Sequence, residues 1–374
     1  MRSRTLAIFG LLSSLALAAV VLTGCSSKED PKANVSDGGD VDAPPCATDA
    51  HRLEAGTCDS VLAWTAGPAL APARAQHSTF IMEKGSKAFL YAVGGTDYKK
   101  DFADAWFSPI QADGTIGAWT MTNGLPTQRK GHATVVSDTL VVVTGGKLGT
   151  AILDKTFYSF VQDDGTLARW LEGVALPGPR FGHSAAVANG RIYVMGGIEA
   201  DKAVAKVYSS KVSTGGFGKW TEVTSLVSPR THHGSFVNGN FLYVVGGFDG
   251  DPAASATPLA DILRAPIMMD GSLGAWSSIA AIDVPLATHS SVIHSGYLYL
   301  LGGAENGNDV TDHVRRATIG ADGAIGAWQA SSPPLPRTSA YNASTPLYKS
   351  RIYSVGGTQD QTSAIGEVSI GTFQ

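Results

Sequence analysis

The sequence of 374 residues has 44 glycines, a net charge of −4, and only 16% charged residues against 44% hydrophobic ones. This composition favours many short strands joined by tight turns, and no segment after residue 25 shows the apolar period of a helix. Because the chain is mildly acidic and has no basic run, we do not expect it to bind nucleic acid.

The N-terminus has the layout of an export signal. Arg2 and Arg4 precede an apolar run from Leu6 to Leu22. A short basic segment followed by such a run directs a chain into the secretory pathway. The run is also close to the length of a membrane-spanning segment, so an uncleaved anchor is the alternative.

The residues that follow the apolar run are LTGC, ending at Cys25, and they resemble the lipobox of bacterial lipoproteins. The resemblance implies that residues 1–24 are a signal peptide and that Cys25 is lipidated, which would hold the chain at a membrane through several acyl chains. Ser26, in place of Asp, favours the outer membrane. Plain secretion and a plain membrane anchor are the alternatives.

Residues 25–45 begin with the lipidated Cys and continue as a polar, Pro- and Gly-containing stretch that predicts a flexible tether. The remaining two cysteines, Cys46 and Cys58, follow it. In an exported protein such a pair predicts a disulfide, which would close the lead-in 46–58 and contribute about 3 kcal/mol. Metal binding by the pair together with His51 is the less favoured alternative.

Beyond the lead-in, the chain repeats one unit about every 50 residues. Each of the first five units has an apolar run ending in two glycines and, 23 to 29 residues later, a Trp, whereas the sixth has only the run and its glycines. The glycine pairs are Gly94–Gly95, Gly145–Gly146, Gly196–Gly197, Gly246–Gly247, Gly302–Gly303 and Gly356–Gly357, and the tryptophans are Trp119, Trp170, Trp220, Trp276 and Trp328. This pattern resembles the kelch repeat, which implies an all-β, six-bladed kelch-type β-propeller over residues 60–374.

The strands of a unit can be derived from its turns. Asn189–Gly190 joins two apolar runs and predicts a tight hairpin, and Asp113–Gly114 predicts a second hairpin later in its unit. Each unit is therefore expected to be a four-stranded meander. The octapeptide ADGTIGAW (112–119), nearly repeated at 269–276 and 321–328, is expected to form the second hairpin and the outer strand.

The sixth unit is incomplete, because the chain after Gly357 has room for a third strand and contains no Trp. The segment SVLAW supplies the missing features, since Val61 and Trp64 have the spacing of the apolar residue and Trp of the other units. We expect residues 59–65 to complete the last blade, closing the ring and removing its exposed edges. The propeller domain then comprises residues 46–374.

A meander places its tight hairpins on one face and its longer connections on the other, and we expect function on this loop-rich face. The units repeat Arg-x-x-His there. The pairs are Arg74/His77, Arg129/His132, Arg180/His183 and Arg230/His233, while the fifth unit has Leu286 with His289 and the sixth has Arg337 with Ala340. We expect these residues to satisfy carbonyls at the blade junctions. A histidine ring for metal binding or proton transfer is the less favoured alternative.

Two neighbouring loops depart from the repeat on the same face. The first is FDGDPAASATPLAD in the fourth unit, and the second is AENGNDVTDHVRR in the fifth. Unselected variation of a tolerant loop is the favoured explanation, and a ligand patch is the alternative. The candidate ligand-binding residues are Asp249, Asp251, Asp309, Asp312, His313, Arg315 and Arg316.

No segment has the residues of a known catalytic motif, and residues 59–374 contain no Cys, which excludes the Tyr–Cys crosslink of galactose oxidase. We expect a monomeric, membrane-anchored envelope module without cofactor or metal, which presents its loop-rich face to a protein or glycan. The alternative is a carbohydrate-acting enzyme similar to a sialic-acid mutarotase. Carboxylates and Arg lining the channel would favour the enzyme, whereas Val, Ala and Ser would favour the binding module.

Overall fold

The computed structural model divides the chain into two compact units, Met1–Pro45 and Cys46–Gln374. It describes residues 61–373 apart from 254–255, 308, 332 and 342–343. The predicted signal peptide, Cys25, the tether and the Cys46–Cys58 pair lie outside the described residues.

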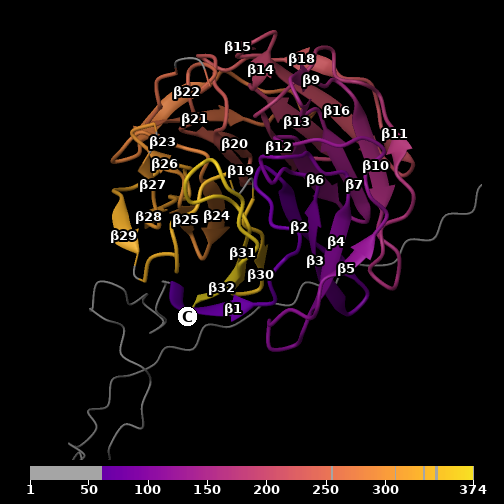
Figure 1. Ribbon diagram of the computed structural model, residues 1–374. Helices are drawn as coiled ribbons and strands as arrows, with labels where there is room; N and C mark the ends of the chain where they lie inside the picture. Colours follow the sequence, from indigo (N-terminus) through magenta and orange to yellow (C-terminus); the bar gives the residue numbers. More distant parts are fainter. Residues whose placement is uncertain (1–60, 254–255, 308, 332, 342–343, 374) are drawn as a thin grey trace, which may run out of the picture. The chain divides into compact units, whose positions relative to one another are not determined.

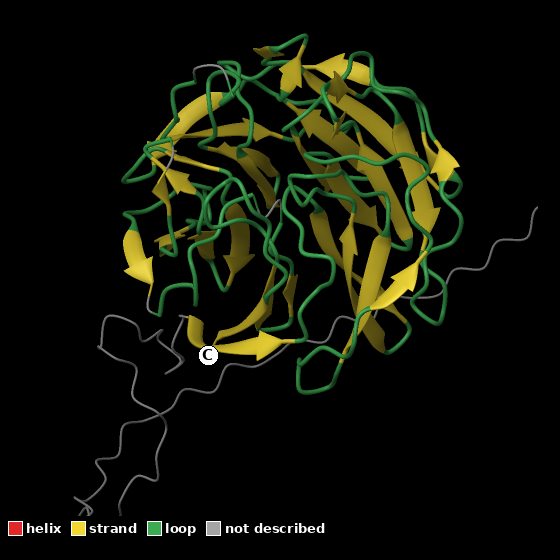
Figure 2. Ribbon diagram, in the orientation of Figure 1, coloured by secondary structure: helices red, strands yellow, loops and turns green. Residues whose placement is uncertain are grey.

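The described residues form strands and no helix (Figure 2), which confirms the all-β prediction. Within this part of the chain, no helix is long and apolar enough to span a membrane.

Five sheets follow one another along the described chain, each an antiparallel meander whose four main strands pair in chain order. Figure 1 shows them as blades around a central axis, with β2, β6, β12, β19 and β24 innermost. The strands are β2 (Ser78–Lys84), β3 (Lys87–Val93), β4 (Ala105–Ile110) and β5 (Thr120–Thr122); β6 (Ala133–Ser137), β7 (Leu140–Thr144), β10 (Thr156–Phe160) and β11 (Leu171–Glu172); β12 (Ser184–Ala188), β13 (Arg191–Met195), β16 (Val207–Ser213) and β18 (Thr221–Val223); β19 (Gly234–Asn238), β20 (Phe241–Val245), β21 (Asp261–Pro266) and β22 (Ser277–Ala281); and β24 (Ser290–His294), β25 (Tyr297–Leu301), β28 (Val314–Thr318) and β29 (Gln329–Ser331).

Short strands extend the connections between these main strands. They are β8 (Lys147–Leu148), β9 (Ala151–Ile152), β14 (Ile198–Glu199), β15 (Lys202–Ala203), β17 (Gly216–Phe217), β23 (Leu286–Ala287), β26 (Ala304–Glu305) and β27 (Asp309–Val310).

A sixth sheet joins the two ends of the described chain. It has the order β1 (Val61–Gly67), β32 (Val368–Phe373), β31 (Arg351–Val355), β30 (Leu347–Tyr348). β1 runs antiparallel to β32, with Trp64 opposite Gly371 and Gly67 opposite Val368. The Trp64 ring covers Gly371 so closely that a Cβ there would lie 2.8 Å from it. The N-terminal segment is thus the fourth strand of the last sheet.

The recurring Asn-Gly and Asp-Gly turns have the conformations that the sequence predicts. Asn189 and Gly190 have φ values of 48° and 67° between the paired strands β12 and β13, as a hairpin with two left-handed residues requires. At the second hairpin, the carbonyl of the turn glycine accepts a hydrogen bond from a buried tyrosine of the preceding blade. The pairs are Tyr91 to Gly165 (2.7 Å), Tyr193 to Gly271 (2.8 Å), Tyr243 to Gly323 (2.9 Å) and Tyr353 to Gly114 (3.0 Å).

The repeated Trp also joins adjacent blades. Its indole N–H donates to a backbone carbonyl at or just beyond the outer strand of the preceding blade. The pairs are Trp119 to Pro68 (2.9 Å), Trp170 to Asn123 (2.8 Å), Trp220 to Val174 (2.8 Å), Trp276 to Thr224 (2.9 Å) and Trp328 to Ala281 (2.8 Å). The octapeptide therefore recurs because both of its ends bind the neighbouring blade.

One part of the octapeptide prediction is wrong. The outer strand β5 begins at Thr120, after Trp119, and pairs with β4 through Phe107 opposite Thr120. Residues 112–119 form the turn and the segment leading to that strand, because Ile116 pairs with Ile110 only as an isolated bridge.

Deleting residues 59–65 should lower the melting temperature of the whole propeller and promote aggregation. The deletion removes most of β1, so the backbone groups of β32 become an exposed edge. Thermal unfolding followed by circular dichroism measures the effect, and deletion of the predicted tether 26–45 is the control. A deletion of 59–65 that melts like the full chain would show that β1 contributes nothing to the ring.

Candidate functional site

A closed ring of backbone hydrogen bonds surrounds the axis where the connections enter the inner strands. Each blade contributes one residue, and its N–H donates to the carbonyl of the equivalent residue in the preceding blade. The bonds run from Gly131 to Gln76 (2.8 Å), Gly182 to Gly131 (3.0 Å), His232 to Gly182 (2.7 Å), Thr288 to His232 (2.9 Å), Tyr341 to Thr288 (3.1 Å) and Gln76 to Tyr341 (3.0 Å). The ring thus returns to its starting residue.

All six ring residues have a left-handed backbone, with φ between 51° and 63°. Glycine adopts this conformation freely, but only Gly131 and Gly182 are glycines. The side chains of the other four are therefore held at the axis by the ring geometry. They are Gln76, His232, Thr288 and Tyr341.

The repeated arginines lie two residues before the ring and are fully buried. Each donates to the carbonyl of the first glycine in the glycine pair of its own blade. The distances are 3.0 Å for Arg74 to Gly94, 2.6 Å for Arg129 to Gly145, 3.0 Å for Arg180 to Gly196 and 3.2 Å for Arg230 to Gly246. Arg74 and Arg230 also form two-bonded pairs with Asp104 and Asp261.

The repeated histidines lie between blades. The His132 ring packs on Gly94 of the preceding blade, where a Cβ would come within 2.8 Å of Cε1, and its own Cβ packs on Gly146. His183 lies on Gly145 in the same way and contacts the Thr144 hydroxyl at 2.9 Å. The first three glycine pairs thus make room for two histidines each.

Burial keeps these imidazoles neutral. It lowers the pKa of His77 and His183 to about 3 and that of His289 to about 4, with the nearby arginine charge acting in the same direction on the first two. Burial also holds the pKa values of His132 and His233 well below the ordinary value. Among the described residues, no group of three or more His, Cys, Asp or Glu side chains is placed to hold a metal ion.

The sixth blade follows the repeat in a register that sequence comparison misses. Its residue equivalent to the repeated Arg is Ser339, whose carbonyl accepts the Gly303 N–H at 2.8 Å as Arg129 accepts that of Gly95. The predicted alignment of Arg337 and Ala340 with the Arg and His positions is therefore wrong by two residues. Arg337 still reaches the Gly356 carbonyl, at 3.3 Å.

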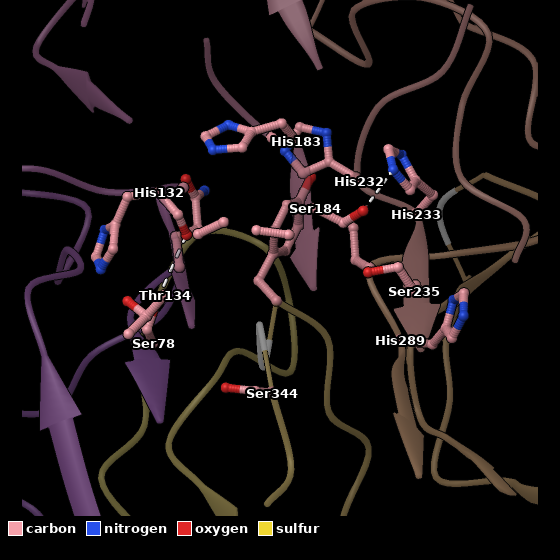
Figure 3. Close-up of a pocket in the computed structure, with 18 of the residues that line it drawn as sticks. Ser78, His132, Thr134, His183, Ser184, His232, His233, Ser235, His289 and Ser344 are labelled. Atoms are coloured by element: carbon pink, nitrogen blue, oxygen red, sulfur yellow. Dashed lines mark hydrogen bonds between the residues drawn. The ribbon is translucent and has the colours of Figure 1, made fainter. Parts of the chain in front are cut away.

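A cavity of about 190 Å³ lies on the axis beside the ring. Figure 3 shows its lining, in which the imidazoles of His132 and His289 point away from the middle toward the blade junctions. The described lining side chains include no Asp, Glu, Lys or Arg. The lining residues with polar side chains are Gln76, Ser78, His132, Thr134, His183, Ser184, His232, His233, Ser235, Thr288, His289, Ser291, Tyr341 and Ser344.

Several of these hydroxyls occupy one repeat position that the sequence analysis missed. Two residues beyond the repeated histidine, or its sixth-blade equivalent, the chain has Thr79, Thr134, Ala185, Ser235, Ser291 and Ser344. The recurrence of Ser or Thr at this position in five of the six repeats could have predicted polar side chains along the axis.

Comparison with known proteins agrees with this architecture. Residues 119–303 match the KLHDC2/KLHL20/DRC7 Kelch-repeats domain. The solved structure of YjhT superimposes with a TM-score of 0.63 at 14% sequence identity, covering 82% of this chain and 99% of that chain. The protein carries a kelch-repeat β-propeller. The likeness to YjhT concerns the fold alone, and a search of curated proteins finds no match.

The first half of the candidate ligand patch, Asp249 and Asp251, lies in a loop whose carboxylates accept hydrogen bonds from the loop's own backbone. Asp249 accepts the Thr257 N–H at 2.6 Å, and Asp251 accepts the Ala253 N–H at 2.9 Å. Asp249 remains exposed and Asp251 is half-buried.

The other half of the patch is an ion-pair group of the fifth blade. Arg315 contacts Glu305 at 2.8 Å and Asp283 at 2.9 Å, and His313 contacts Glu305 at 2.7 Å. Burial acts to raise the pKa of Glu305, but the bond with His313 and the charge of Arg315 outweigh it and hold that pKa below its usual value. Arg316 is buried away from this group, with its guanidinium over the Tyr297 ring.

The two halves are neighbours without a direct polar contact among the described residues. Their loops approach where Gly307 lies beside Pro258. Asp309 is exposed and Asp312 half-buried. The side chains of the patch that face solvent are therefore chiefly Asp249, Asp309 and His313.

The free energy of unfolding should fall as the pH drops from about 6.5 toward 4. The unfolded imidazoles take up protons near their ordinary pKa of 6.5, whereas the folded ones stay neutral until about pH 4 or below. The stabilisation is therefore fully present above pH 6.5 and is lost as the pH falls through the folded pKa values. Urea unfolding at about pH 7.5, 5.5 and 4.5 measures this dependence.

Replacing one buried imidazole, in His289→Gln, should make the free energy of unfolding depend less steeply on pH. His313→Gln is the matched control, because the His313 side chain is 57% exposed. An unchanged slope in His289→Gln would contradict the assignment of the acid sensitivity to the buried histidines.

Proposed function

We propose that this protein is a non-catalytic binding module held at the bacterial envelope. The observation that carries the proposal is the chemistry of the axial cavity, whose described lining contains hydroxyls, an amide and neutral imidazoles but no charged side chain. The lipobox-like residues ending at Cys25 support the lipid anchor, with the outer membrane as the favoured location.

The cavity is poorly suited to acid–base catalysis. A general acid or base works best when its pKa lies near the working pH. Burial lowers the pKa of His232 to about 4, although the Asp251 charge opposes the shift, and it raises the pKa of Tyr341 far above neutrality. Neither group exchanges protons readily at pH 7, so the site favours binding over turnover.

The partner surface that we propose is the acidic side of the loop-rich face. The side chains of Asp249 and Asp309 are exposed there, and Glu305 is largely engaged by Arg315 and His313. Exposed carboxylates raise the association rate of partners that carry positive charge or hydrogen-bond donors. A protein or a glycan of that kind would bind across the fourth and fifth blades.

A photo-crosslinking residue at Asp309 should capture a defined envelope component in living cells. The matched control position is Asp270, which is exposed at the tip of a hairpin on the opposite face. Crosslinked species at Asp309 and none at Asp270, analysed by mass spectrometry, support the proposal. No species at Asp309, or the same species at both positions, would overturn it.

The alternative of a carbohydrate-acting enzyme has one observation in its favour, a polar cavity on the propeller axis. It predicts faster exchange between the anomers of a reducing sugar. We expect the purified protein to leave the exchange rate of D-glucose and N-acetylneuraminate equal to that in buffer, as measured by NMR. Saturable acceleration of either sugar would establish the enzyme and contradict the binding module.

A further inference from the structure

The hydrogen-bonded ring lies at the loop-rich end of the axial cavity. The backbone N–H and C=O groups of this ring bond to one another. Aromatic contacts fill the space around it, since the His232 ring lies 5.5 Å from that of Tyr341 and 5.3 Å from that of Phe181. The backbone groups of the ring are therefore satisfied, and only its side chains remain to contact a ligand.

The channel continues toward the hairpin face. Inner strands alternate their side chains, so the residues two positions beyond the hydroxyls line the same side. In five of the blades these residues are aliphatic and half-buried, and we call them the aliphatic collar: Ile81, Val136, Val187, Val237 and Ile293. A second hollow of about 480 Å³ lies at this end of the inner strands, bordered by Ile81, Val136 and Leu347 and, at its outer side, by Glu83 and Asp138.

The cavity offers hydrogen bonds that the described protein groups do not use. The Oγ1 atoms of Thr134 and Thr288 and the Oγ of Ser291 are buried without a partner among the described residues. Buried hydroxyls normally have a partner, supplied by protein, water or ligand. A ligand with several hydroxyls could both donate to and accept from them.

The absence of charge from the described lining selects against ions. A carboxylate or ammonium group that entered would lose its hydration and meet no opposite charge. The cavity volume of about 190 Å³ is below the roughly 300–1,000 Å³ of sites for drug-sized ligands. Its chemistry and size therefore fit a small neutral molecule.

We propose that the axial cavity binds a small uncharged polyol, which enters through the aliphatic collar on the hairpin face. Hydroxyls of the ligand would satisfy Thr134, Thr288 and Ser291, and the collar would shield these bonds from water. This site is separate from the loop surface assigned to the partner, so either can fail without the other.

The test uses the full-length protein in a sugar-free zwitterionic detergent. The probes are erythritol, xylitol and D-mannitol, with D-gluconate and D-glucosamine as charged compounds of similar size. Titration calorimetry and saturation-transfer NMR should show saturable binding of at least one neutral polyol, and at least tenfold weaker binding of both charged compounds. Saturation matters because polyols also stabilise proteins non-specifically by exclusion from their surface.

Two variants test whether the polyol binds in the axial cavity. Ala185→Leu adds volume to the lining and should abolish binding, and Thr134→Val removes one hydroxyl at similar volume and should weaken it at least threefold. Thr120→Val, on the exposed outer strand β5, is the matched control and should bind like the natural sequence. Unfolding curves establish that each variant is folded.

Three results would overturn the proposal. They are no saturable binding of any neutral polyol, equal binding of neutral and charged probes, and unchanged binding in folded Ala185→Leu. None of them bears on crosslinking at Asp309 or on anomer exchange, so the proposed function is judged separately.

Discussion

The closed ring of six backbone hydrogen bonds at the axis is the constraint on which the rest of the propeller depends. It places every blade at a fixed distance from the next, because each ring N–H has one acceptor and each acceptor belongs to the neighbouring blade. Gln76, His232, Thr288 and Tyr341 adopt left-handed backbones without being glycine, which costs on the order of 1 kcal/mol each. The cooperative ring and the packing around it must offset that strain.

The glycine pairs and buried arginines extend this constraint outward. Gly95 can approach His77 and the Ala75 carbonyl only because it has no side chain, since a Cβ would lie within 2.7 Å of both. The buried carbonyl of the adjacent glycine, Gly94, is then satisfied by Arg74. In the first four blades, glycine, arginine and histidine therefore depend on one another, which explains why they recur together there.

The sequence predicted the features that arise from local chemistry. The hairpin at Asn189–Gly190 follows from turn conformation, and turns of this kind recur often enough to be recognised. The hydrogen-bonded ring was not predicted, because side chains as different as Gln76 and Tyr341 occupy its positions and the bonds use only the backbone. The sixth blade was misaligned for a similar reason, since Ser339 contributes a carbonyl where other blades have arginine. The cavity was not predicted either, because its lining residues come from several blades and no single stretch of sequence contains them.

Pairing of β1 with β32 also has a kinetic consequence. The paired residues of the two strands are separated by almost the whole described chain, with Val61 opposite Phe373. The entropy of closing so long a loop must be overcome before the contacts form, and topologies rich in distant contacts fold slowly. During synthesis, β1 emerges before the other described strands and remains without its partner until β32 has been made. The first and last described strands thus complete one sheet, so the propeller acquires its full cooperativity only after β32 has been made.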